Sequence, residues 1–331
     1  MQAAQIVSPD QMRVLAVAEP EPKADEVIIE VKASGICGTD IHIYRGEYLG
    51  PYPVIPGHEF AGVVIAAGAQ VTRFKPGDRV AVEPNIACDN CLHCLNNRQN
   101  FCLNWQAVGV TRPGGMAQQV AAPEKAVFAI GALPFEAGAF MEPLSCVLHG
   151  LERLQAEIAC NAAILGAGPI GILLLQGLRL QGAAQVTVVD KNAARAEFAS
   201  QRGADRTLTS LEALPQDAFD VVIDATGALP VMRRALDFAR PGGKVLWFGV
   251  PPSGQVVEIE PFKVFHKGLT VLSSFTSVRN STQALDLLQS GRINLEGLVS
   301  HHLPLEELER GIHILEQGLE GVRKVQVLPN G

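Results

Sequence analysis

The chain has 331 residues, of which 47% are hydrophobic and 18% charged. This length exceeds what one core usually accommodates and fits two domains, and the composition excludes a chain that is mainly disordered. The net charge is −7 and aromatic residues make up 5%. We therefore expect no nucleic-acid partner, because such a protein needs a basic surface to meet the phosphates.

Neither a membrane span nor a signal peptide is expected. The sequence has no run of about 18 uncharged apolar residues, the length that a membrane helix needs. Its beginning, MQAAQIVSPDQMR, lacks the basic start and apolar core of a secretory signal. We expect a cytoplasmic protein with no membrane partner, in which the seven cysteines stay reduced and need a role other than disulfide bonding.

The first part of the chain alternates short β-branched, apolar runs with turns that contain proline and glycine. Strands are expected at Val14–Val17, Val27–Ala33, Gly62–Ala67 and Arg79–Val82. Breakers such as Pro76-Gly77-Asp78 separate them. This pattern predicts a mainly β domain that is antiparallel or barrel-like.

The pattern changes near residue 135. Helical spacing with few breakers predicts a helix over Phe135–Ala156. From there to about residue 275, apolar strands alternate with helices, which indicates a parallel sheet with helices on both faces. The expected strands are Ala162–Leu165, Gln185–Val189, Val221–Asp224, Val245–Gly249 and Leu269–Ser273, with helices at Asn192–Arg202 and Pro230–Ala239. The tail has amphipathic helices at Thr282–Gln289 and Pro304–Gln317, and we expect it to rejoin the first domain.

A G-x-G-x-x-G motif follows the strand that ends at Leu165. It consists of Gly166, Ala167, Gly168, Pro169, Ile170 and Gly171. The first glycine permits the tight turn, the second lets the backbone approach a pyrophosphate, and the third lets the helix pack on the strand. The N-terminus of the helix then stabilises the anion. The alternative is an ordinary glycine-rich turn, but the strand–turn–helix setting favours a dinucleotide site.

The choice of dinucleotide depends on Asp190, which follows the next strand. A carboxylate at this spacing, about 20 residues after the glycines, accepts hydrogen bonds from ribose hydroxyls. It also repels a 2′-phosphate, so NAD is favoured over NADP. Lys191 and Arg195 are nearby cations that weaken this preference.

Four cysteines lie in one polar loop. Cys88, Cys91, Cys94 and Cys102 have the spacing C-x2-C-x2-C-x7-C. Four thiolates this close in sequence predict a closed tetrahedral Zn²⁺ site. An iron–sulfur cluster is the rival, but the fourth spacing differs and no proline follows Cys102. Four unliganded thiols are the remaining alternative.

A second set of candidate ligands is spread over three short motifs. Cys37 lies in GICGTDIH, His58 and Glu59 lie in PGHEF, and Glu142 lies in MEPLS. Each residue alone is ambiguous, since a lone cysteine is usually a small buried hydrophobe and a lone histidine more often a core residue than a ligand. Spacing alone cannot join these segments into one site.

Together, the motifs resemble the zinc-dependent medium-chain alcohol dehydrogenase superfamily over essentially the whole chain. The resemblance rests on GICGTDIH, PGHEFAGVV, PGDRV, the four-cysteine loop, MEPLS, GAGPIG and VVD, in the order of the family. It implies a GroES-like, mainly β catalytic domain over residues 1–147, an inserted doubly wound Rossmann domain over 148–275, and a return to the catalytic domain over 276–331. The fold class is therefore α/β.

The resemblance also implies the site. Cys37 and His58 would hold a catalytic Zn²⁺, and Glu59 and Glu142 would complete its shell or exchange in it, with no choice made between them at rest. With the four-cysteine site this gives two Zn²⁺ per chain. A glutamate at position 142 resembles the sorbitol, other polyol and threonine dehydrogenases, whereas simple-alcohol dehydrogenases have a cysteine there.

The same resemblance assigns a proton relay. Thr39 would accept the proton of the substrate hydroxyl, which the metal acidifies, and the relay would pass through the cofactor ribose to His42 and solvent. Histidine suits this step because it titrates near neutrality. Asp40 would orient His58. Arg45 and Glu47 are expected to be solvated rather than to contact the substrate.

These features predict an NAD- and zinc-dependent dehydrogenase that converts a secondary alcohol of a polyol, sugar alcohol or sugar acid into a ketone. The first alternative is the same chemistry on L-threonine or a vicinal diol. A non-catalytic NAD-binding protein is a remote alternative, because the ligand residues are all present. The expected partners are a small alcohol or ketone substrate and further copies of the chain, in a dimer or a tetramer.

Overall fold

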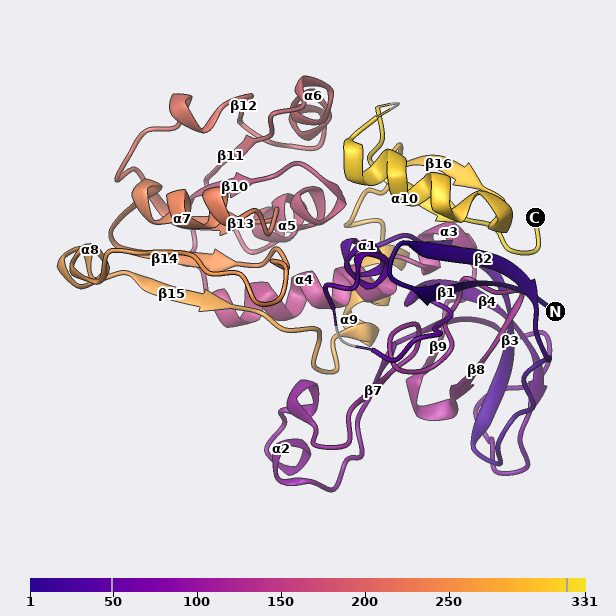
Figure 1. Cartoon of the computed structure of the whole chain (residues 1–331). Coiled ribbons are helices and arrows are strands. Elements are labelled where there is room, and N and C mark those ends of the chain that lie inside the picture. Colours follow the sequence, from indigo (N-terminus) through magenta and orange to yellow (C-terminus); the bar gives the residue numbers. More distant parts are fainter. Residues whose placement is uncertain (49, 320) are drawn as a thin grey trace. The chain divides into compact units, whose positions relative to one another are not determined.

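The computed structural model describes residues 1–48, 50–319 and 321–331. The chain forms two compact units: Met1–Ser145 together with Thr276–Gly331, and Cys146–Phe275. It therefore leaves the first unit once and returns to it, as the course of the ribbon colours in Figure 1 shows. The described residues include no helix that is both long and apolar enough to span a membrane.

The first unit is built mainly from β-strands. Its central sheet has the order β16-β17-β3-β4-β5-β9, and β8 also pairs with β3. These strands are β3 (Glu26–Gly35), β4 (Glu59–Ala67), β5 (Arg79–Val82), β8 (Gln119–Pro123), β9 (Val127–Ala129), β16 (Val299–Leu303) and β17 (Lys324–Val327). Two small sheets pair β1 (Gln2–Ser8) with β2 (Gln11–Ala16), and β6 (Asn85–Ile86) with β7 (Gln106–Ala107).

Strand β3 occupies the middle of this unit because its sequence is apolar on alternate positions. Val27, Ile29 and Val31 are completely buried and pack with Phe60 and Val64 of β4 in one core cluster. A residue period of two places these side chains on the same face of the sheet. The pairing of β3 with β4 thereby fixes the positions of the segments that follow β3 and precede β4.

The helices of the first unit lie around this sheet. They are α1 (Gly38–Arg45), α2 (Leu92–Leu95), α3 (Phe135–Gly138), α9 (Ser281–Gln289) and α10 (Leu308–Gln317), and α4 (Met141–Leu154) continues into the second unit. Single 3₁₀ turns of this unit occur at Gln99–Phe101, Glu124–Ala126 and Leu305–Glu307, and the second unit has one at Leu211–Ala213. A second core cluster contains residues of α1, α10, β1 and β17, so α1 is packed against the C-terminal segment.

The second unit is a parallel α/β sheet in the order β12-β11-β10-β13-β14-β15. Its strands are β10 (Asn161–Leu165), β11 (Gln185–Val189), β12 (Arg206–Leu208), β13 (Phe219–Asp224), β14 (Ala239–Trp247) and β15 (Thr270–Ser273). Its helices are α5 (Pro169–Leu180), α6 (Ala193–Gln201), α7 (Leu229–Phe238) and α8 (Pro261–Lys267). The strand order reverses between β10 and β13. This is the doubly wound order, in which a dinucleotide binds where the order reverses, at the carboxyl ends of the strands.

One predicted helix is divided in two. The stretch expected as a single helix, Phe135–Ala156, forms α3 and α4 instead. Pro143 explains the break, since a proline inside a helix lacks the N–H and clashes with the preceding turn, whereas in the first turn that N–H is not needed. Starting α4 at Met141 places Pro143 in its first turn.

Other boundaries also differ from the expected ones, with β14 and α10 as two examples. Strand β14 begins at Ala239 and ends at Trp247 rather than at Gly249, because the N–H groups of Phe248 and Gly249 turn to the carbonyl oxygen of Asp224. The expected helix over Pro304–Gln317 starts with a 3₁₀ turn before α10 begins at Leu308. The strands expected at Arg79–Val82 and Gln185–Val189 have the expected bounds.

Candidate functional site

Cys37, His58 and Glu59 lie together at one end of the β3–β4 pair. Gly35, the last residue of β3, is opposite Glu59, the first residue of β4. Cys37 follows β3 and precedes the first turn of α1. One ligand atom from each of Cys37, His58 and Glu59 lies within 4.8 Å of the other two. A thiol, an imidazole and a carboxylate are the donor set of a catalytic Zn²⁺ site, so these residues fit that metal.

Asp40 supports this group from α1. Its side chain is 1% exposed, and its two oxygens accept hydrogen bonds from the N–H of Cys37 (2.8 Å) and of Gly57 (3.1 Å). Its Oδ1 also lies 3.5 Å from Nδ1 of His58. That separation is too long for a good hydrogen bond, and Nδ1 has no hydrogen-bond partner in the described part of the chain. Asp40 thus fixes the backbone on both sides of the group.

The electrostatics of the group favour a bound cation. Burial alone would lower the pKa of His58, but the neighbouring Asp40 and Cys37 raise it well above its ordinary value. For Asp40 the directions are reversed. Burial alone would raise the pKa of this carboxyl, but the interaction with His58 and the two backbone donors lowers it. Acidic groups that hold a proton on a buried imidazole would equally favour a divalent cation in its place.

Lys324, which the sequence analysis did not identify, contacts this group from β17. Its side chain is buried, and its Nζ pairs with Oε2 of Glu59 and donates to the carbonyl oxygen of Ile36 at 2.9 Å. Burial would lower the pKa of Lys324, but Glu59 and Cys37 raise it. The only sequence signal was a lysine in a strand that is otherwise apolar or uncharged, KVQV.

Glu142 lies in the first turn of α4 and is 8% exposed. It is not a member of the Cys37–His58–Glu59 group whose ligand atoms lie within 4.8 Å of one another. The structure thus brings together three of the four residues that the resemblance assigned to the catalytic metal. The role of Glu142 stays a prediction.

Thr39 and His42 are both on α1, three residues apart, and therefore lie on the same side of the helix. Nδ1 of His42 lies 2.9 Å from Oε2 of Glu47. Helix α1 ends at Arg45, and Gly46, with a left-handed φ of 78°, turns the chain so that Glu47 faces back to His42. Glu47 is therefore paired with His42 rather than simply solvated.

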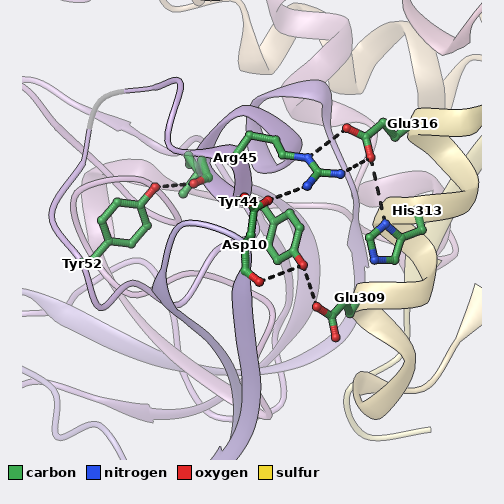
Figure 2. A network of polar contacts seen from close by, with 8 residues as sticks. Asp10, Tyr44, Arg45, Tyr52, Glu309, His313 and Glu316 are labelled. Atoms are coloured by element: carbon green, nitrogen blue, oxygen red, sulfur yellow. Dashed lines mark hydrogen bonds and ion pairs between the residues drawn. The ribbon is translucent and has the colours of Figure 1, made fainter.

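A polar network fixes the other side of α1 to α10 (Figure 2). Arg45 donates to both oxygens of Glu316, at 3.0 and 2.6 Å, and to Oδ1 of Asp10 at 2.5 Å. The hydroxyl of Tyr44 donates to Oε1 of Glu309 at 2.6 Å. Burial, together with that glutamate, raises the pKa of Tyr44 to about 12. Arg45 therefore forms ion pairs with Glu316 and Asp10, whereas we had expected a solvated side chain.

The four cysteines of the polar loop form a second group. Ligand atoms of Cys88, Cys91, Cys94 and Cys102 all lie within 4.8 Å of one another. The N–H of Cys88 donates to Sγ of Cys102 at 3.2 Å, and backbone N–H groups of Cys94 and Leu103 lower the pKa of Cys91 to about 6. Burial raises the pKa of Cys94 to about 12. Four sulfurs that lie within 4.8 Å of one another fit a closed Zn²⁺ site.

The glycine motif forms the turn between β10 and α5. Gly166 has a φ of 109°, and a Cβ on Gly171 would lie 1.9 Å from the carbonyl oxygen of Gly166. Gly168 precedes the first turn of α5 and, unlike Gly171, is not crowded, because a Cβ there would meet nothing within 4 Å. The backbone is therefore open at Gly168, where the sequence argument puts the pyrophosphate, and Pro169 and Ile170 begin the helix whose N-terminus faces it.

Asp190 stands next to this turn. Its Oδ2 accepts from the N–H of Ala167 and its Oδ1 from the N–H of Asn192, both at 2.8 Å. The exposed Lys191 follows it, and Arg195 lies in α6. The structure therefore brings the acidic residue and the glycine turn together at the carboxyl ends of adjacent strands, as a dinucleotide site requires.

Two protein families match the chain. Residues 23–132 match the alcohol dehydrogenase GroES-like domain, and residues 169–290 match the zinc-binding dehydrogenase family. D-altritol 5-dehydrogenase of Agrobacterium fabrum (strain C58) is 38% identical, over 88% of this chain and 90% of that protein. An L-threonine 3-dehydrogenase of Bacillus licheniformis is 34% identical, over 94% of each.

Solved structures match the fold of this chain over nearly its whole length. A zinc-binding dehydrogenase from Sinorhizobium meliloti 1021 bound to NADP has a TM-score of 0.94 and 36% identity, covering 99% of both chains. An alcohol dehydrogenase from E. coli CFT073, complexed with NADH, has a TM-score of 0.91 and 29% identity, again over 99% of both. The predicted fold, a GroES-like domain with a Rossmann-like domain, is thereby confirmed. The chain belongs to the zinc-binding medium-chain alcohol dehydrogenase family and is an enzyme of its polyol and threonine dehydrogenase type.

Proposed function

We propose that this enzyme uses NAD to oxidise a secondary alcohol of a polyol, sugar alcohol or sugar acid to a ketone. The observation that carries the proposal is that Cys37, His58 and Glu59 lie together where β3 ends and β4 begins. This donor set suits a metal that keeps a position open for a hydroxyl. The 38% identity to a D-altritol dehydrogenase supports a polyol as the substrate class.

We assign the proton-transfer roles to α1. When bound, Zn²⁺ would acidify the substrate hydroxyl and NAD would accept the hydride. Thr39 accepts the hydroxyl proton in this proposal, and His42 passes it to solvent. Glu47 orients His42 through Nδ1. Asp40 holds the backbone of Cys37 and Gly57 in place through its two hydrogen bonds.

The metal shell is assigned to Cys37, His58 and Glu59, with Glu142 as the group that exchanges with Glu59. Glu142 is buried and lies in the first turn of α4. The second Zn²⁺ is held by Cys88, Cys91, Cys94 and Cys102, and such a four-thiolate site also fits a reducing compartment such as the cytoplasm.

We propose NAD rather than NADP because of Asp190. Its carboxylate is placed beside the glycine turn by two backbone N–H groups, where it can accept from the ribose hydroxyls and would repel a 2′-phosphate. The two similar structures carry different cofactors, NADP in one and NADH in the other. The preference therefore rests on this side chain and not on the relatives.

L-Threonine is the second candidate substrate. The 34% identity to an L-threonine 3-dehydrogenase favours it over a vicinal diol. Threonine and a polyol both offer a secondary hydroxyl to the same donor set, so the chemistry of the site does not separate them. The difference lies in the charged amino and carboxyl groups that only threonine brings.

A substrate panel tests the proposal. Initial rates of NADH formation are measured with pentitols, hexitols, sugar acids, L-threonine and 2,3-butanediol at equal concentrations. We expect the highest kcat/KM with a polyol or a sugar acid. A higher kcat/KM with threonine than with every polyol would overturn the assignment of substrate class.

Light scattering of the same sample tests the proposed dimer or tetramer.

A further inference from the structure

Lys324 is a buried cation in direct contact with a proposed metal ligand. Lys324 and Glu59 are 4% and 2% exposed, and Nζ of the lysine pairs with Oε2 of the glutamate. A buried ammonium group costs several kcal/mol unless it is paired and hydrogen-bonded. Here the ion pair and the carbonyl oxygen of Ile36 meet that requirement.

The backbone around the pair leaves room for it. A Cβ on Gly35 would lie 2.2 Å from Oε2 of Glu59 and 2.9 Å from Cε of Lys324. Any other residue at position 35 would therefore displace the ion pair. Lys324 reaches this place because β17 pairs with the end of β3, with Gln326 opposite Gly35.

With a metal bound, Glu59 would stand between two positive groups. A carboxylate oxygen of Glu59 belongs to the group that includes Cys37 and His58, and its Oε2 is held by Lys324. A metal in that group and the lysine would attract the same carboxylate. The strength of one interaction then reduces the other, because a carboxylate has a single negative charge to share.

We propose that Lys324 is a positioning residue that competes with the catalytic metal for Glu59 and so keeps a metal coordination position available to the substrate hydroxyl. The inference deepens the proposed function, since it rests on the assignment of Cys37, His58 and Glu59 to that metal. Without the lysine, Glu59 would bind the metal more firmly and the site would open less readily.

Zinc release tests this inference without reference to any substrate. Zinc-loaded wild type, Lys324→Met and Lys324→Arg are mixed with a chromogenic chelator. We expect the Cys37–His58–Glu59 site to release its zinc before the four-cysteine site, so the faster phase of zinc release is followed. We expect Lys324→Met to slow that phase by about tenfold, the scale at which neighbours of metal ligands act. Its kcat should fall, whereas Lys324→Arg, which keeps the charge, should stay close to wild type in both measurements.

A double-mutant cycle separates this role from simple charge repulsion between the lysine and the metal. In a Glu59→Gln background, Lys324→Met removes only that repulsion, so its effect on zinc release should become much smaller. The variant that lacks both charges also leaves no unpaired buried charge. If Lys324→Met does not fold, Lys324→Gln replaces it, because its amide keeps a donor for Ile36.

Three results would overturn the inference. One is a folded Lys324→Met protein that releases zinc as fast as wild type or faster. Another is an equal effect of Lys324→Met with and without the Glu59→Gln substitution, which would assign the whole effect to repulsion. The third is a wild-type protein with no chelatable zinc, which would contradict the ligand assignment itself; an unexpected substrate in the panel would leave the inference intact.

Discussion

Thr39 and His42 share one side of α1, but their surroundings give them different tasks. Thr39 is two residues from Cys37, the first proposed metal ligand, whereas His42 is one turn further on and pairs with Glu47, whose side chain is 43% exposed. A group close to the reacting oxygen cannot be replaced by water. A group near the surface can, since water reaches the same place.

Replacing Thr39 by valine should therefore abolish most of the activity. The change removes the hydroxyl at nearly constant volume, and loss of a general acid–base group typically lowers the rate by about 100- to 10,000-fold. Thr39→Ser keeps a hydroxyl and is the matched control, expected to retain most of kcat. The measurement is kcat with a polyol, with zinc content checked to be unchanged.

His42→Gln belongs to the same test and should cost less, about tenfold, because water can substitute for the imidazole. It should also change the pH dependence of kcat, because it removes a group that transfers a proton. Near-normal turnover of Thr39→Val, with a deuterium isotope effect showing that hydride transfer limits the rate, would refute the assigned relay.

Asp190 should determine the cofactor preference through its charge. A carboxylate and a phosphate charge about 4 Å apart repel by about 1 to 4 kcal/mol, depending on exposure to water. Asp190→Asn removes the charge and keeps one of the two oxygens, so the N–H group of either Ala167 or Asn192 loses its acceptor. We expect the ratio of kcat/KM for NAD over NADP to fall by about tenfold or more. A wild-type enzyme that is faster with NADP would show that Lys191 and Arg195 outweigh Asp190.

At the scale of the secondary-structure elements, the turn from β10 into α5 separates two demands on glycine. Gly171 is required by packing, because a Cβ would lie 1.9 Å from a backbone oxygen. Gly168 has open space at the same position and an ordinary φ of −68°. The structure therefore gives no packing reason for Gly168, and a ligand is the reason that remains.

Alanine at these two positions should give opposite results. Gly168→Ala should leave the thermal unfolding temperature near that of wild type but raise the KM for NAD by about tenfold or more, because a methyl group would stand where the pyrophosphate approaches. Gly171→Ala should destabilise the second unit by about 1 to 3 kcal/mol through overpacking. Unchanged NAD binding in a stable Gly168→Ala protein would refute the proposed position of the pyrophosphate.

The link between α1 and α10 should be visible in the stability of the first unit. Tyr44→Phe removes the hydrogen bond to the Glu309 carboxylate, which should lower the free energy of unfolding by about 1 to 2 kcal/mol near neutral pH. The pKa of Tyr44 is raised to about 12 by burial and by Glu309. Its contribution is therefore complete below about pH 10, where the unfolded chain starts to ionise, and is lost as the pH rises towards 12.

Urea unfolding at a series of pH values checks this prediction. The difference between wild type and Tyr44→Phe should be constant between pH 7 and about pH 9 and should shrink above about pH 10. Equal stability of the two proteins at neutral pH would show that the Tyr44–Glu309 contact does not help to fix α1.

For the molecule as a whole, the α/β fold class and about half of the described strands followed from the sequence. The strand at Gln185–Val189, QVTVV, is rich in β-branched residues and was predicted with its observed bounds. Strand β1 was not predicted, because QAAQIVS lacks a clear alternation. The edge strand β12 has three residues, too few for periodicity to reveal. Its position is fixed by pairing with β11.

The site was predictable only where the residues lie close in sequence. Four cysteines in one loop indicated their metal directly, whereas Cys37 and His58 were joined only through the family resemblance. Lys324 could not be predicted, because it lies far along the chain and is brought to Glu59 by the pairing of β17 with β3. Long-range strand pairing of this kind leaves no local pattern in the sequence.

The four-cysteine group and the Cys37–His58–Glu59 group should differ from each other in how firmly they hold zinc. The four-thiolate site has a complete shell of its own, whereas the Cys37–His58–Glu59 site uses a carboxylate that Lys324 also attracts. We expect elemental analysis to find two Zn²⁺ per chain, with one released first to a chelator. Freshly purified protein with one zinc or none would contradict this assignment.

The most direct test of the central claim follows activity during this removal. NADH formation with the best polyol is measured against the zinc remaining in the protein, while circular dichroism monitors the fold. The account predicts that activity falls in proportion to the first zinc released, with the fold intact, and that it returns when Zn²⁺ is added back. Full activity in a protein stripped of both zinc ions would contradict it.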